Sequence, residues 1–231
     1  MKKFTTIFLC GAILLSGCGM SNLGKGSLIG SGAGAAIGAG VGYLIGKDGK
    51  STAIGAAIGT AVGGGTGAII GNQMDKKAKE LEALNNAQIE TITDVNGLTA
   101  IKVTFPSGIL FDFNKSTLSK EAKAELAEFA KDLADLPDTD LTIWGHTDNV
   151  GSAEANQSVS EKRALAVAKL FKSKGIAESR LHAQGQSFNF PVADNDTESG
   201  RARNRRVEVY VTANEAMIEA AKAEAAKQGK E

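Results

Sequence analysis

Residues 141–163 read LTIWGHTDNVGSAEANQSVSEKR, and the fold follows from the elements they contain. The apolar stretch 141–144 predicts a buried strand, and the polar, glycine-containing stretch after it predicts a loop. A helix is expected next, ending at Gly175, and its apolar positions are Val159, Ala166, Val167, Leu170 and Phe171. A strand, a loop and a helix in this order are typical of an α/β domain.

Further elements are expected on both sides of this stretch. Upstream, residues 109–113 predict a short strand. An amphipathic helix follows, whose apolar positions step by four and three from Leu118 until Pro137 stops it. Downstream, residues 181–185 and 207–212 predict two more strands. The order β-α-β-α-β-β over residues 106–213 predicts an α/β fold, a two-layer sandwich with a mixed sheet.

Two segments flank this domain. Residues 73–105 predict a connector that contains a charged helical stretch and then a β-hairpin, whose turn is Asn96-Gly97. Residues 214–231 are rich in Ala, Lys and Glu, which favours a solvated helix with frayed ends. We assign no function to this tail.

Glycine recurs at every fourth position in two runs, Gly30 to Gly46 and Gly55 to Gly71, with a turn signal between them. This spacing places the glycines on one helical stripe, where two helices can approach closely. The uncharged segments 28–46 and 53–71, which contain these runs, would each reach about 28 Å as a helix, close to the thickness of a bilayer core. Residues 28–72 therefore predict a glycine-zipper helical hairpin in or on a membrane. A flexible linker and oligomeric packing without lipid remain alternatives.

The first residues predict an export signal. Lys2 and Lys3 precede a short apolar region, which ends in the sequence LSGC at residues 15–18. This pattern resembles the lipobox of bacterial lipoproteins. The resemblance implies cleavage of residues 1–17, lipidation of Cys18, and a lipidated linker over residues 18–27. Gly19 favours a periplasm-facing anchor in the outer membrane, with the inner membrane as the alternative.

Composition excludes several classes of protein. Lys+Arg and Asp+Glu both number 26, so there is no basic excess of the kind that nucleic-acid binding requires. The two cysteines are Cys10 and Cys18, and there are two histidines. A disulfide framework, a Cys/His metal site and a cofactor are therefore not expected.

Four ordered blocks carry a family resemblance: LFDFNK at 110–115, GHTDNVG at 145–151, NQSVSEKRA at 156–164 and NRRVE at 204–208. They resemble the OmpA-like C-terminal domain, which binds peptidoglycan, over roughly 105 residues. With the lipobox and the glycine runs, the whole chain is similar to lipoproteins of the YiaD type.

The resemblance implies a site for the diaminopimelate residue of the peptidoglycan stem peptide. Asp148 would take its ammonium group, and Arg163 would take its carboxylate through a bidentate contact. Thr147 and Asn156 would add neutral hydrogen bonds, and Asn114 would contact the peptide from the other side. A further carboxylate contact is expected from Arg205 or Arg206, of which we choose Arg206.

Most of these residues have a structural alternative. Asp148 and Arg163 could form a salt bridge that serves the fold alone, and Asn114 and Asn156 could satisfy loop backbones. Arg205 and Arg206 alternate in direction at the start of a strand, so one of them could be a solvated or structural arginine. Among other polar or aromatic residues, a loop cap is preferred for Asp112, a core position for Trp144, and ordinary hydrogen bonding for His146 and His182.

The sequence thus predicts a lipid-anchored envelope protein that binds peptidoglycan non-covalently and tethers membrane to wall. Enzymatic activity is not expected, because no activated nucleophile, metal set or cofactor loop is present. The alternative is a membrane-active or oligomeric assembly factor in which the glycine-zipper hairpin is the functional unit. A motor stator is disfavoured, because neither glycine run carries the Asp that would move a proton. A homo-oligomer is left open.

Overall fold

The computed structural model describes residues 64–112 and 115–228. Six helices and five strands lie in these ranges, with short 3-10 turns at Leu133–Asp135 and Glu178–Arg180. The helices are α3 (Gly64–Leu81), α4 (Ser107–Leu110), α5 (Lys120–Asp132), α6 (Ala153–Ser173), α7 (Glu198–Asn204) and α8 (Glu215–Gln228). The strands are β1 (Gln88–Thr93), β2 (Thr99–Pro106), β3 (Thr139–Gly145), β4 (Leu181–Gly185) and β5 (Arg206–Ala213).

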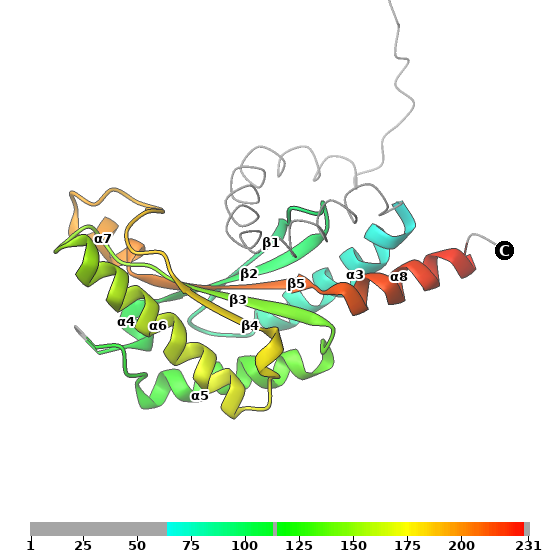
Figure 1. Cartoon of the computed structure of the whole chain (residues 1–231), viewed down its shortest axis with the longest axis horizontal. Helices are drawn as coiled ribbons and strands as arrows, with labels where there is room; N and C mark the ends of the chain where they lie inside the picture. Colours follow the sequence, from blue (N-terminus) through cyan, green and yellow to red (C-terminus); the bar gives the residue numbers. More distant parts are fainter. Residues whose placement is uncertain (1–63, 113–114, 229–231) are drawn as a thin grey trace, which may run out of the picture.

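The strands form one mixed sheet in the order β1-β2-β5-β3-β4. β3 and β4 run parallel and are joined through α6, whereas the other neighbours run antiparallel. Figure 1 shows α5 and α6 side by side on one face of the sheet, with α3 and α8 together at one end. The mixed α/β sandwich expected from the sequence is therefore confirmed.

Alternation along the strands explains how the sheet divides its residues between two faces. Val207, Val209 and Val211 of β5 are fully buried in the main core, which also contains the helices. Phe105, Phe129 and Phe171 meet there, with ring centroids 5.8 and 5.5 Å apart. The opposite face carries a second cluster of Ile92, Ala100, Trp144 and Tyr210.

Short polar residues define where the main helices begin. Ser119 caps α5 by accepting a hydrogen bond from the backbone N–H of Ala122, and Ser152 caps α6 in the same way through Ala155. Each cap satisfies a backbone donor that the first helical turn leaves free. At the other end of α6, Gly175 adopts a φ of +97°, which terminates the helix as the sequence predicted.

One expected strand is wrong. Residues 109–113 were predicted as a strand, but Ser107–Leu110 form the helical turn α4. The backbone N–H of Ser107 donates to the carbonyl of Arg205, and Phe111 makes a single bridge to Leu118. A short apolar run fits a strand and a buried helical turn equally well. Here the residues form the turn, and its first residue is hydrogen-bonded to Arg205, which is distant in the sequence.

The β-hairpin belongs to the sheet of the domain. β1 and β2 surround the Asn96-Gly97 turn as predicted, and β2 pairs with β5 along its length. The predicted charged helix begins much earlier than expected, since α3 starts at Gly64, inside the second glycine run. The predicted helical tail is α8, and it packs against α3.

Several predictions fall on residues outside the described ranges. They are the signal peptide, the Cys18 anchor and its linker, Asn114, and the glycine-zipper hairpin except for its last residues. Within residues 64–112 and 115–228, no helix combines the length and the apolar character that crossing a membrane requires.

Candidate functional site

The site forms where α6 passes over the ends of β3 and β4. Gly145 and Gly185 are paired across these strands, and α6 lies directly on them. A Cβ atom at Gly145 would stand 2.1 Å from the carbonyl oxygen of Ser160, and one at Gly185 would stand 2.5 Å from the backbone nitrogen of Glu161. Glycine at both positions thus permits the close approach that carries Arg163 of α6 toward the loop after β3.

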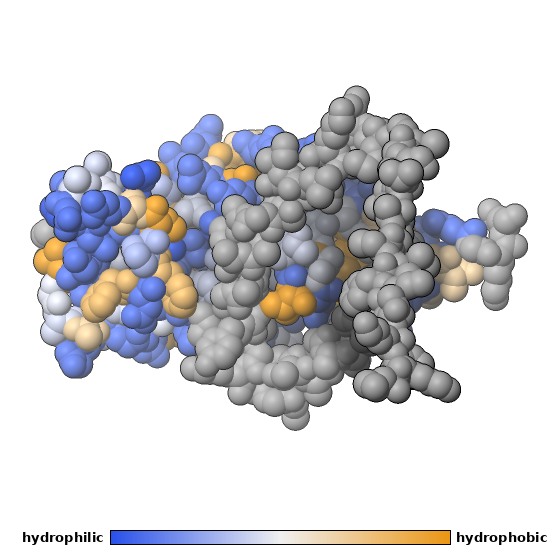
Figure 2. All heavy atoms as spheres, turned by 90° about the horizontal axis from the view of Figure 1, so that it is seen from above, coloured by the Kyte–Doolittle hydropathy of each residue, from blue (hydrophilic) through white to orange (hydrophobic). Residues whose placement is uncertain are grey.

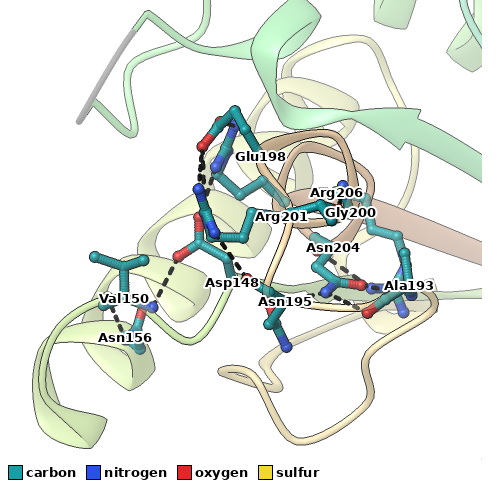
Figure 3. A network of polar contacts seen from close by, with 12 residues as sticks. Asp148, Val150, Asn156, Ala193, Asn195, Glu198, Gly200, Arg201, Asn204 and Arg206 are labelled. Carbon is teal, nitrogen blue, oxygen red and sulfur yellow. Dashed lines mark hydrogen bonds and ion pairs between the residues drawn. The ribbon is translucent and has the colours of Figure 1, made fainter.

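The loop after β3 holds Asp148 in a fixed turn. The Oδ1 atom of Asp148 accepts a hydrogen bond from the backbone N–H of Val150 at 3.1 Å, which forms an Asx turn. Asn156 of α6 braces the same loop, because its Nδ2 atom donates to the carbonyls of Val150 and Ser152. Figure 3 shows Asn156 directed at this loop. The structure thus gives Asn156 the role of satisfying a loop backbone.

Asp148 forms an ion pair with Arg205, at the end of α7. The distance from Asp148 Oδ2 to Arg205 Nη1 is 2.6 Å, and the Asp148 side chain is 12% exposed. Arg205 also bonds to Glu198, which in turn bonds to Arg201. The hydrogen bond that Arg205 donates to Asp148 raises the pKa of the Arg205 guanidinium, and the bond to Glu198 acts in the same direction. Arg205 is therefore held between two carboxylates.

Arg163 has a different environment. Its guanidinium lies over the ring of Phe111, 5.2 Å from the centroid, and its Nε atom donates to the carbonyl of Lys115 at 3.2 Å. Within the described part of the chain, no carboxylate lies within ion-pair distance (4.0 Å) of Arg163, although the residue is 93% buried. Burial lowers the pKa of its guanidinium, the charge of Arg205 lowers it further, and Asp148 opposes both.

Arg163 and Arg205 line one cavity of about 430 Å³. Its other walls come from α4 and the start of α5, and include Ser107, Phe111 and Asp112. A buried guanidinium without an acidic partner strongly favours an anion, and a carboxylate can accept two parallel hydrogen bonds from it. The cavity is therefore suited to a carboxylate. Asp148 is not one of its wall residues, but its ion pair with Arg205 holds a carboxylate beside an arginine that does line the cavity.

The structure brings most of the predicted site residues together. Asp148 and Arg163 lie close enough for the charge of Asp148 to affect the pKa of Arg163, and Arg205, the ion-pair partner of Asp148, lines the same cavity as Arg163. Thr147 precedes Asp148 but is buried, and its Oγ1 has no hydrogen-bond partner among the described residues. Asn114 lies outside the described ranges.

The choice of Arg206 over Arg205 needs correction. Arg206 is the first residue of β5, and its guanidinium turns away from Asp148 to bond Glu208 and the carbonyls of Asn204 and Phe190. In Figure 3, Arg206 lies on the far side of Asn204 from Asp148. Arg205 is the arginine that reaches the site, because consecutive residues at the start of a strand point to opposite faces.

Sequence reasoning missed two residues of the cavity wall, Ser107 and Phe111, and the carboxylate Glu198, which bonds to Arg205 outside that wall. Ser107 begins the turn α4, Phe111 lies in the segment predicted as a strand, and Glu198 belongs to α7, which was not predicted. Of these residues, only Phe111 could have been singled out from the sequence, because it is an aromatic residue in the first of the four sequence blocks. Within the described ranges, no group of three His, Cys, Asp or Glu side chains is arranged to hold a metal ion.

The surface around the site is mainly polar. Figure 2 shows hydrophilic residues with small separate apolar patches at the end of the molecule that carries α7. The exposed apolar side chains include Val150 beside Asp148, and Phe190 and Val192 in the loop before α7. Isolated apolar residues of this kind are normal on a soluble surface.

Comparison with known proteins identifies the class of this domain. Residues 110–205 match the OmpA family, and residues 1–75 match the YMGG-like Gly-zipper family. Both halves of the family resemblance drawn from the sequence are thereby confirmed: the chain carries an OmpA-like domain preceded by a glycine zipper.

Individual relatives agree with this class. Outer membrane porin F of Pseudomonas fluorescens is 41% identical over 105 residues, which are 46% of this chain and 32% of the porin. The probable lipoprotein YiaD of Escherichia coli is 34% identical over 112 residues, which are 48% of this chain and 51% of YiaD. The chain thus spans about a third to a half of the length of these two relatives.

A solved structure has the same fold. The cell wall anchor of the T6SS from Pseudomonas aeruginosa superimposes with a TM-score of 0.52 and 27% sequence identity. The match covers 61% of this chain and 97% of that one.

Proposed function

We propose that this protein binds peptidoglycan non-covalently through the diaminopimelate residue of the stem peptide and so ties a membrane to the cell wall. The observation that carries the proposal is the buried Arg163, which lines the cavity and has no carboxylate within ion-pair distance in the described part of the chain. One structural relative is a cell wall anchor, which supports the same function.

Diaminopimelate fits this arrangement because its free end carries a carboxylate and an ammonium group on one carbon. The carboxylate would enter the cavity and bond to Arg163 and Arg205. The ammonium would bond to the Asp148 carboxylate, which has further lone pairs besides those used by Val150 and Arg205. A lysine in the same position of the stem lacks the carboxylate and would leave Arg163 unpaired.

Binding of one stem peptide is expected to be modest, because each charge-assisted hydrogen bond contributes only about 1.5–3 kcal/mol before the cost of immobilisation. Attachment at two ends compensates for this. A lipid anchor keeps the domain near the wall, and the wall presents many identical stem peptides. This function requires no covalent chemistry, so we propose a binding protein and not an enzyme.

Sedimentation with purified peptidoglycan tests the binding site. The full-length protein should pellet with a diaminopimelate-type wall, whereas Asp148→Ala and Arg163→Ala should remain in the supernatant with an unchanged circular dichroism spectrum. Asp138→Ala and Arg203→Ala are matched controls, because both residues are exposed and lie outside the cavity. Equal sedimentation of all five proteins would disprove the site.

A second experiment tests the lipid anchor. Cys18→Ala should move the protein from the membrane fraction to the soluble fraction, since acyl chains on this cysteine would supply the attachment. The same variant should still sediment with peptidoglycan, because the wall site lies elsewhere in the chain. Retention of Cys18→Ala in the membrane fraction after salt washing would show that another segment provides the anchor.

A further inference from the structure

Glu208 lies on the sheet face opposite the main core, behind the candidate site. Its side chain is 4% exposed, and its carboxylate accepts hydrogen bonds from three side chains. Arg206 Nε donates to Oε1 at 2.9 Å, while His146 Nε2 and Tyr210 Oη lie 3.1 and 2.7 Å from Oε2. Lys102 adds a positive charge at 3.7 Å.

Two of these three partners are adjacent in sequence to site residues. His146 begins the loop that contains Asp148, and Arg206 directly follows Arg205. The same two segments are joined again by the backbone, since the N–H of His146 donates to the carbonyl of Arg206 at 2.9 Å. The ion pair between Asp148 and Arg205 is a third link between the same two segments, and it lies at the candidate site.

We infer that Glu208 is a positioning residue for the ligand site: by binding His146 and Arg206 together, it fixes the distance between Asp148 and Arg205. The inference rests on the proposed function, because it concerns the geometry of the peptidoglycan site. Glu208 does not line the cavity of Arg163 and Arg205, so it acts through the two segments that it joins.

The charges in this cluster are consistent with such a role. Burial alone would raise the pKa of the Glu208 carboxyl, but the His146 hydrogen bond and the charges of Arg206 and Lys102 together lower the pKa far below its usual range. The carboxylate therefore stays ionised and accepts from all three donors. A glutamine here has no negative charge and only one acceptor oxygen, so it cannot accept hydrogen bonds at both of its polar atoms, and the charge-assisted bond to Arg206 is weakened.

Titration calorimetry with the soluble tripeptide L-alanyl-γ-D-glutamyl-meso-diaminopimelate tests this inference in the full-length protein. Glu208→Gln should weaken binding by at least about fivefold, or about 1 kcal/mol. Tyr210→Phe is the matched control, because it removes another buried hydrogen bond from the same carboxylate but belongs to neither segment. It should lower stability and leave the affinity unchanged. If Glu208→Gln does not fold, Arg206→Lys replaces it with the same expectation.

A double-mutant cycle separates positioning from general destabilisation. In the Asp148→Asn background, Glu208→Gln should cause no further loss of affinity, because the interaction that it positions is already weakened. Provided that the wild-type protein binds the tripeptide, two results would overturn the inference. Glu208→Gln could bind as tightly as the wild type, or Glu208→Gln and Tyr210→Phe could lose the same amount of affinity. Failure of the wild-type protein to bind the tripeptide would instead overturn the proposed function, and this inference with it.

Discussion

At the scale of single residues, the buried imidazole of His146 makes stability depend on pH. Burial lowers the pKa of His146 below its ordinary value of 6.5, and the bond to Glu208 only partly opposes this. Below about pH 6.5 the unfolded chain therefore binds more protons at this residue than the folded chain. The free energy of unfolding should fall with decreasing pH, by up to about 1.4 kcal/mol per unit, until the folded state is protonated as well.

Urea denaturation at pH 7.5, 6.5 and 5.5 measures this dependence. His146→Gln should reduce the loss of stability across the series, although the variant is less stable at every pH. His182→Gln should keep the wild-type dependence, because His182 is exposed on β4. An unchanged dependence in His146→Gln would show that another group causes it.

Single residues also show which parts of a site a sequence can predict. Asp148 and Arg163 were identified because they lie in two of the four sequence blocks, and the structure places both at one site. Arg205 and Arg206 could not be distinguished, because their directions depend on where β5 begins. That boundary is set by the pairing of Arg206 with Pro106 of β2, a contact between distant parts of the chain.

At the scale of secondary-structure elements, the crossing of α6 over β3 and β4 depends on two glycines. Gly145→Ala would place a methyl group against the backbone carbonyl of Ser160, which no side-chain rotation can relieve. Overpacking of this kind costs about 1–3 kcal/mol. Gly145→Ala should therefore lower the free energy of unfolding by at least that amount and weaken the proposed binding of peptidoglycan, since α6 carries Arg163.

The control for this prediction is Gly108→Ala. A Cβ atom at Gly108 would meet no atom within 4 Å, so this variant should retain the stability of the wild type. Thermal and urea unfolding of both variants provide the measurement. A fully stable Gly145→Ala protein would mean that α6 can shift away from the strands without cost.

Elements with a strong local signal were predicted well, and those set by tertiary contacts were not. α5 and α6 have regular apolar spacing and defined ends, at a serine cap and at Gly175 respectively. The turn α4 has an apolar sequence that fits a strand, and its backbone is held by Arg205, about a hundred residues away. The short helix α7 has only Thr197 as a signal, which caps it through Gly200.

At the scale of the whole molecule, the domain extends beyond the four blocks that identified it. The hairpin β1–β2 supplies two of the five strands, and α3 covers the end of the sheet beside it. α3 and α8 come from opposite ends of the described chain and lie side by side in Figure 1. Gly65 of α3 allows a close approach to Ala225 of α8, where an added Cβ atom would be only 3.2 Å away.

α8 packs against α3, so the C-terminal tail has a structural role that its composition did not indicate. Ile218 of α8 is 2% exposed and belongs to the same core as Ile70 and Met74 of α3. Ile218→Ala should lower the free energy of unfolding by about 2–5 kcal/mol, because it removes buried methyl groups and leaves a cavity. Glu219→Ala, at an exposed neighbouring position, should change it by less than about 0.5 kcal/mol. Urea denaturation of the two variants provides the measurement, and equal stability of the two would mean that α8 does not hold α3 in the core of the domain.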